Sequence, residues 1–90
     1  MSNTPTIIIA DDDMTIRLVV AEALRQEGWN IAEAVDLPEL NTLINNGVGD
    51  VVVTDVLMPG GNSLKVLPDM ISLRPDLPFI VMSAHNTLST

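Results

Sequence analysis

Short apolar runs alternate along this chain with longer segments in which apolar residues recur at helical spacing. The apolar runs, which predict buried strands, span residues 6–10, 30–34, 50–54 and 79–82. The segments between them predict helices over about 14–27, over about 37–46, and from Asn62 or Ser63 to Arg74-Pro75. This alternation predicts an α/β fold in which a parallel sheet is covered by helices on both faces. All carboxyl ends of the strands then lie along one edge of the sheet.

The spacing of apolar residues predicts which face of each helix is buried. The inward residues are predicted to be Ile16, Val19, Val20, Ala23 and Leu24, then Leu40, Leu43 and Ile44, and then Leu64, Leu67, Met70 and Ile71. The polar residues Arg17, Glu22, Arg25 and Gln26 are predicted to be solvated. Pro68 removes a backbone donor from the third helix and predicts a kink or a late start.

The helix boundaries carry end signals, and one strand carries an edge signal. Asp13 is a candidate N-cap, and Gly28 is a natural residue for the helix stop. Asp36 and Glu39 have the spacing of a capping box. Glu33 places a charge in the strand 30–34, which suits the edge of a sheet.

The composition bounds the possible functions. Ninety residues make one small domain, and a hydrophobic content of 47% excludes a disordered chain. The net charge of −8, from 12 acidic and 4 basic side chains, argues against direct contact with nucleic acid. The absence of cysteine excludes disulfides and thiolate metal sites. No apolar run is long enough to cross a membrane and no signal-peptide pattern is present, so we predict a cytoplasmic protein.

Polar residues gather where the predicted strands end. Asp11 and Asp12 follow the first strand, Asp55 ends the third before a Pro-Gly-Gly turn, and Ser83 ends the fourth. In an open parallel sheet this edge is where ligands bind. Each residue also has an ordinary interpretation as a cap, a solvated acid or a strand-end hydroxyl. Because acidic residues end two separate apolar strands, we prefer the interpretation that they form a functional site.

The predicted cluster has a defined chemistry. Carboxylates placed close together repel one another unless a cation lies among them, and an oxygen-only ligand set favours Mg²⁺. One carboxylate can act as a nucleophile toward phosphorus and form an acyl phosphate, while the metal neutralises the transferring group. The hydroxyl of Ser83 is a candidate hydrogen-bond donor to the added phosphoryl group.

At these residues the sequence resembles the receiver domain of bacterial two-component response regulators. The matching motifs are the strand followed by Asp11-Asp12, the stretch from Thr54 to Gly60, and Val81-Met82-Ser83-Ala84. The resemblance covers essentially the whole chain, 1–90, and implies a flavodoxin-like (CheY-like) doubly wound parallel sheet. Further details, such as Arg-Pro-Asp-Leu-Pro at 74–78, are most similar to nitrogen-regulation members of the family.

The resemblance implies a role for each site residue. Asp55 would be the phosphoacceptor of a histidine kinase, and Ser83 the switch hydroxyl that moves toward the phosphoryl group. Asp12 would bind Mg²⁺ directly, with Asp11 beside it and the backbone carbonyl of Leu57 as a further ligand. The domain would be a signalling phosphoacceptor rather than an enzyme, with self-phosphorylation from small phosphodonors only. It would control output ATPase and DNA-binding domains in nitrogen-responsive transcription activation.

The chain departs from the family pattern at its carboxyl end. Family receivers have five strands and five helices, and a lysine at the end of the fifth strand completes their site. This chain stops at Thr90, and its only lysine, Lys65, lies in the third predicted helix. We therefore expect an incomplete receiver, truncated after the fourth strand, that accepts phosphoryl groups poorly. We also expect the strand 79–82 to be an uncharged edge through which the chain forms a homodimer or aggregates.

Two alternatives remain open from the residues. The stretch Asp11 to Thr15 also fits the Asp-x-Asp-x-Thr motif of haloacid-dehalogenase-like phosphatases, with Asp11 as nucleophile and Asp13 as acid and base. Those enzymes need a later lysine and a distal acidic pair, which are not found here, and this alternative leaves Asp55 unexplained. The other is a degenerate receiver-like interaction module that is not phosphorylated. The identity of the phosphorylated residue discriminates among the three.

Overall fold

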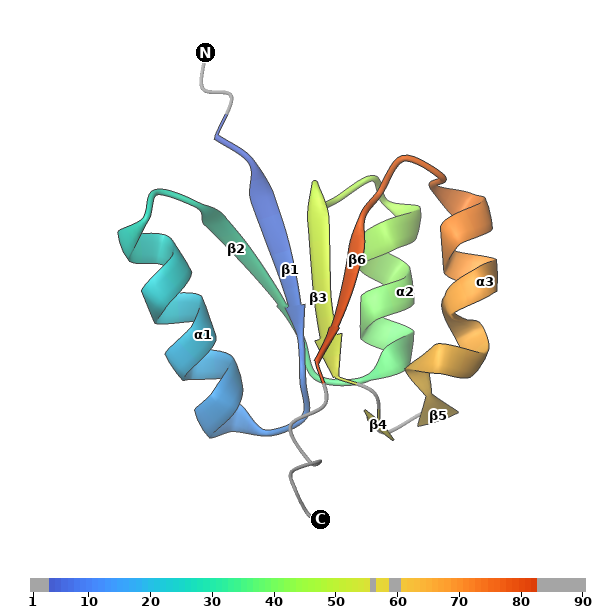
Figure 1. The fold of residues 1–90 in the computed structure, drawn as a ribbon, viewed down its shortest axis with the longest axis horizontal. Helices are drawn as coiled ribbons and strands as arrows, with labels where there is room; N and C mark the ends of the chain where they lie inside the picture. The colour runs from blue at the N-terminus through green and yellow to red at the C-terminus, as the bar shows by residue number, and fades with distance from the viewer. Residues whose placement is uncertain (1–3, 56, 59–60, 83–90) are drawn as a thin grey trace.

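The computed structural model describes residues 4–55, 57–58 and 61–82 of the chain. Its elements are β1 (Thr6–Ala10), α1 (Met14–Gln26), β2 (Asn30–Ala34), α2 (Leu37–Asn45), β3 (Val51–Asp55), β4 (Leu57–Met58), β5 (Gly61–Asn62), α3 (Ser63–Leu73) and β6 (Phe79–Met82). The predicted alternation of strands and helices is confirmed, with boundaries that differ by a residue or two (Figure 1). The short β4 and β5 were not predicted. They form an antiparallel pair on either side of the expected turn.

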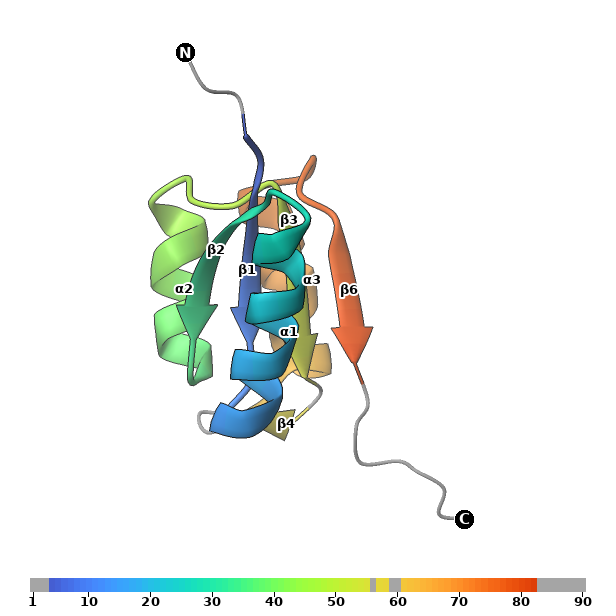
Figure 2. The same cartoon turned by 90° about the vertical axis from the view of Figure 1, so that its left-hand side faces the viewer.

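The main sheet has four parallel strands in the order β2-β1-β3-β6. All four arrows point the same way in Figures 1 and 2, so the carboxyl ends share one edge as predicted. β2 lies at one edge, which agrees with its charged residue Glu33. In the centre, Ala10 of β1 lies opposite Thr54 of β3. This register places Asp11, which follows β1, beside Asp55, the last residue of β3.

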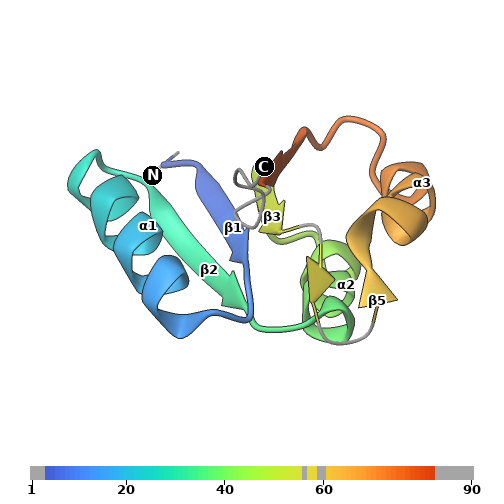
Figure 3. The ribbon, with the colours of Figure 1, turned by 60° about the horizontal axis from the view of Figure 1, so that its bottom comes forward.

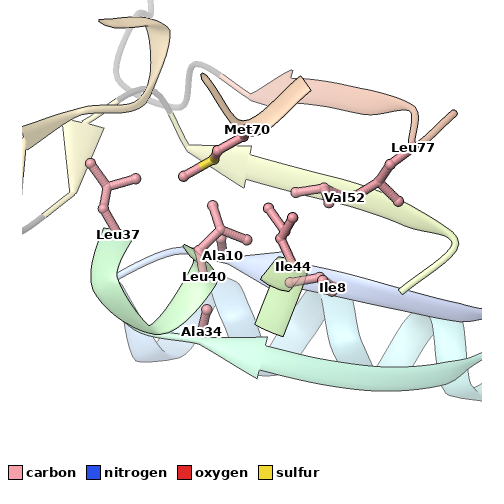
Figure 4. Packing of buried hydrophobic residues seen from close by; sticks show 9 residues of the cluster. All are labelled: Ile8, Ala10, Ala34, Leu37, Leu40, Ile44, Val52, Met70 and Leu77. Carbon is pink, nitrogen blue, oxygen red and sulfur yellow. The ribbon is translucent and has the colours of Figure 1, made fainter. Parts of the chain in front are cut away.

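Helices cover both faces of the sheet, with α1 on one and α2 and α3 on the other (Figure 3). The alternation of side chains along β1 supplies both layers, because Ile8 faces α2 while Ile7 and Ile9 are buried outside that cluster. The main core lies under α2 and α3 (Figure 4). Its buried members are Ile8, Ala10, Ala34, Leu37, Leu40, Ile44, Val52, Met70 and Leu77. The predicted burial of Leu40 and Ile44 is confirmed, and Leu43 packs against them half-buried.

The predicted face of α1 is partly wrong. Val19 is 64% exposed and Ala23 is also exposed, whereas Ala21 is fully buried. Arg17, predicted to be solvated, has a side chain only 12% exposed because it pairs with Glu33 on β2. Because Ala21 is small, α1 can approach the sheet closely at this position. The ion pair with Glu33 satisfies the charge of Arg17, so α1 presents the face that carries Ala21 and Arg17 to the sheet.

α3 begins at Ser63, as predicted, and continues through Pro68 to Leu73 without the alternative late start. Its buried face includes Met70, but Ile71 is 42% exposed, so the predicted burial of Ile71 is wrong. The side chains of Leu64 and Leu67 lie outside the described part of the structure. Among the described residues, no helix combines the length and apolarity needed to span a bilayer.

The predicted helix ends are confirmed by hydrogen bonds. Asp13 Oδ1 accepts from the backbone N–H of Thr15 at 2.9 Å and of Ile16 at 3.1 Å, and so caps α1. Asp36 Oδ1 accepts from Glu39 N at 2.8 Å. The returning bond of this capping box comes from Val35, one residue earlier than the usual donor. These caps fix where α1 and α2 begin at the carboxyl edge of the sheet.

Candidate functional site

Three carboxylates meet at the carboxyl edge of the sheet. Asp11 and Asp12 follow β1, and Asp55 is the last residue of the neighbouring β3. One oxygen from each lies within 4.8 Å of the others. The convergence predicted from two distant stretches of sequence is therefore confirmed for these residues, which we call the acidic cluster.

The three members of the acidic cluster differ in exposure. Asp11 is 1% exposed and Asp55 is 3% exposed, whereas Asp12 is open to solvent. Two of the three carboxylates are thus buried, and the third is the one most open to solvent.

Asp11 has a buried oxygen that lacks a hydrogen-bond donor. Its Oδ1 accepts from Asp13 N at 2.8 Å, but Oδ2 has no partner among the described residues. A buried acceptor without a partner is costly, and a cation would satisfy it. Together with a donor set made only of oxygen, this atom fits a hard divalent ion such as Mg²⁺.

The electrostatics of the cluster agree with this fit. Burial raises the pKa of the Asp11 carboxyl above its usual value, although the hydrogen bond from Asp13 N opposes the shift. The negative charges of Asp55, Asp12 and Asp13 raise that pKa further. The site therefore favours either a proton or a cation among its carboxylates.

The other predicted site residues are less fully described. Leu57 begins β4, two residues after Asp55, and its backbone pairs with Asn62. Ser83 lies outside the described residues. Asp13, which the phosphatase alternative requires as acid and base, is not a member of the acidic cluster and caps α1 instead.

One residue of the site was missed by sequence reasoning. Arg17 Nη1 donates to the backbone carbonyl of Asp11 at 2.9 Å, and Arg17 Nε donates to Glu33 Oε1 at 2.9 Å. The sequence signal for this contact is Glu33, a charged residue within an otherwise apolar strand. In the structure the Glu33 side chain is only 28% exposed, so its charge needs a partner. From the sequence alone, Glu33 indicates only the protection of a sheet edge.

The sheet order, the two helical layers and the acidic cluster together define a receiver-type domain. Residues 7–90 match the response regulator receiver domain family, and the chain belongs to this family. The family match argues against the phosphatase alternative. That alternative was already disfavoured because Asp13 caps α1.

Within the family, the chain is similar to the DNA-binding transcriptional regulator NtrC of Rhizobium meliloti, with 46% identity over 94% of this chain. It spans only 18% of the length of that relative. Among solved structures, it is similar to the response regulator TrrA of Thermotoga maritima in complex with Mg²⁺-BeF, with a TM-score of 0.85. The two sequences are 29% identical, and the match covers 92% of this chain and 72% of the TrrA chain. TrrA in complex with the histidine kinase ThkA gives a TM-score of 0.84 and 28% identity over 97% of this chain and 75% of that one.

Proposed function

We propose that this domain accepts a phosphoryl group from a histidine kinase onto Asp55, with Mg²⁺ bound in the acidic cluster. The observation that carries the proposal is the meeting of Asp11, Asp12 and Asp55 within 4.8 Å, with a buried and unsatisfied oxygen on Asp11. Such a site needs positive charge, and a bound divalent ion supplies it for both the carboxylates and an incoming phosphoryl group.

The residues have distinct roles in this proposal. Asp12, Asp11 and Asp55 provide carboxylate ligands, and the backbone carbonyl of Leu57 provides a further ligand. Mg²⁺ prefers six oxygen ligands, so part of its shell is left for water and phosphate oxygens. Ser83 is proposed as the hydroxyl that binds the added phosphoryl group and reports its presence.

Phosphoryl transfer itself requires little from the domain beyond positioning. A carboxylate oxygen of Asp55 forms a bond to phosphorus as the bond from phosphorus to the kinase imidazole nitrogen breaks, and the electron pair leaves with that nitrogen. Asp55 is suited to this because the last position of β3 fixes its backbone. The product is an acyl phosphate, and the domain acts as a phosphoacceptor in signalling.

The relatives support the proposed setting. TrrA has been solved with a histidine kinase and with Mg²⁺-BeF, which supports both a kinase partner and a magnesium site for this chain. The similarity to NtrC supports an output in nitrogen-responsive transcription, through ATPase and DNA-binding domains of the full-length protein. A cytoplasmic location and a homodimer stay predictions.

A comparison of variants tests the proposal. Prolonged incubation with acetyl phosphate and Mg²⁺ should add one phosphoryl mass to the wild-type chain and to Asp76→Asn, but not to Asp55→Asn. Asp76 is a matched control because it is an exposed acid that precedes β6, at the amino edge of the sheet, whereas the site lies at the carboxyl edge. Chelation of Mg²⁺ should abolish the mass shift. Equal modification of Asp55→Asn and wild type would contradict the proposal.

A further inference from the structure

Arg17 contacts the acidic cluster without belonging to it. Its guanidinium donates from Nη1 to the Asp11 carbonyl and from Nε to the Glu33 carboxylate, both at 2.9 Å. The side chain starts in the first turns of α1 and, like most helical side chains, points back toward the helix N-terminus, where Asp11 lies. One side chain thus joins α1, β2 and the residue that follows β1.

The Asp11 backbone is held on both sides. Its N–H donates to Ala34 O at 3.1 Å, which extends the pairing of β1 with β2 by one residue. Its carbonyl accepts from Arg17. The Asp11 carbonyl and the Asp12 N–H belong to one planar peptide group, so the bond from Arg17 also fixes the direction in which the chain enters Asp12.

Asp12 depends on this backbone more than its neighbours do. Asp11 and Asp55 are buried, so packing restrains their side chains, whereas Asp12 is exposed. No hydrogen bond or ion pair holds the Asp12 carboxylate within the described part of the chain. Its place in the acidic cluster is therefore set by its backbone.

We propose that Arg17, held by Glu33, is a positioning residue that fixes the Asp11–Asp12 peptide and thereby keeps the Asp12 carboxylate in the acidic cluster. The proposal rests on the proposed function, because it assigns Arg17 a role in Mg²⁺ binding. The guanidinium is suited to the task because its rigid fork serves two acceptors at once, whereas a lysine ammonium is a single flexible point charge.

Arg25 provides a matched control. Arg25 Nη2 lies 3.4 Å from Glu33 Oε2, so it shares the same carboxylate as Arg17. Its side chain is 47% exposed, and it makes no contact with Asp11 among the described interactions. Arg25→Met removes an ion pair of Glu33 and a positive charge, but leaves the bond to the Asp11 carbonyl in place.

The test measures Mg²⁺ affinity and the metal-free backbone in the same variants. Mg²⁺ is titrated into the ¹⁵N-labelled chain, and the Asp12 amide is followed by chemical shift and by hydrogen exchange before metal is added. Arg17→Met should weaken Mg²⁺ binding about tenfold, the lower end of the range for residues that orient metal ligands. It should also shift the metal-free Asp12 amide and speed its exchange. Arg25→Met should bind Mg²⁺ within about twofold of wild type.

The outcomes separate the two proposals. If wild type binds no Mg²⁺, the proposed function fails, and the metal-free Asp12 amide still decides the role of Arg17. If wild type binds and Arg17→Met matches it in affinity and in the Asp12 amide, the role of Arg17 is overturned. If Arg17→Met does not fold, Arg17→Lys replaces it in the test. We expect Arg17→Lys to bind Mg²⁺ more weakly than wild type. An Arg17→Lys variant with the Mg²⁺ affinity and the Asp12 amide of wild type would contradict the proposal. Equal weakening by Arg17→Met and Arg25→Met would also overturn it, because general loss of charge would then be the cause.

Discussion

Asp55 illustrates how a single buried side chain can favour function over stability. It is 3% exposed, and its charge contributes to the raised pKa of Asp11. We therefore expect Asp55→Asn to raise the free energy of unfolding of the metal-free chain, because it removes a negative charge beside the buried Asp11 carboxylate. Urea denaturation in the presence of a chelator measures this change, with Asp76→Asn as the control. A variant that is less stable than wild type would contradict the expectation.

The raised pKa of Asp11 predicts that the stability of the chain depends on pH. Because its pKa in the folded chain lies above the ordinary value of 3.8, the folded state holds a proton more tightly than the unfolded state does. Its contribution to stability is therefore full below the unfolded pKa and is lost as pH rises through the folded pKa. In the absence of metal, we expect wild type to lose stability relative to Asp11→Asn as the pH rises from the unfolded to the folded pKa of Asp11. A difference that stays constant with pH would show that the Asp11 pKa is unshifted.

At the scale of elements, apolar runs were sufficient to predict the strands. Ile7, Ile8 and Ile9 read as a strand buried on both faces, and the structure buries all three. The face of α1 could not be predicted, because periodicity alone treats Arg17 as solvated. Its partner Glu33 lies in another element, so the burial of Arg17 is a tertiary effect.

The candidate site was largely predictable for a topological reason. In a parallel sheet every strand ends at the same edge, so the order of elements in the sequence was enough to place Asp11, Asp12 and Asp55 along one edge. That β1 and β3 are neighbours in the sheet, which brings the three carboxylates within 4.8 Å, is shown by the structure. Their unequal burial and the bond from Arg17 to the Asp11 carbonyl depend on packing and were not predictable. The antiparallel pair of β4 and β5 was missed because each strand has only two residues, too few for a pattern.

The loop between α2 and β3 offers a test of packing at the element scale. Gly49 has a φ of +94°, and a Cβ there would lie 2.7 Å from Ile8 Cδ1 in the main core. Gly47 also has a positive φ, of +78°, but a Cβ there would meet nothing within 4 Å. We expect Gly49→Ala to cost about 3 kcal/mol through both strain and overpacking, and Gly47→Ala about 1 kcal/mol through strain alone. Equal losses in urea denaturation would show that contact with Ile8 is unimportant.

At the scale of the whole molecule, β6 forms one edge of the described sheet. It pairs with β3 on one side, and its residues Ile80 and Val81 are 54% and 37% exposed. An apolar edge strand without charge favours pairing with another chain. We expect the 90-residue chain to associate in a concentration-dependent way, and Ile80→Lys to shift it toward monomer in sedimentation experiments. A wild-type chain that stays monomeric at high concentration would contradict this.

The central claim is that the acidic cluster makes Asp55 the phosphoacceptor of this receiver domain. Its most direct test locates the phosphoryl group. Wild-type chain treated with acetyl phosphate and Mg²⁺ is reduced with borohydride, which converts an aspartyl phosphate to homoserine, and its peptides are then sequenced by mass spectrometry. We predict homoserine at position 55 and intact aspartate at 11, 12 and 13. Homoserine at Asp11, or at no position after prolonged treatment, would contradict the account.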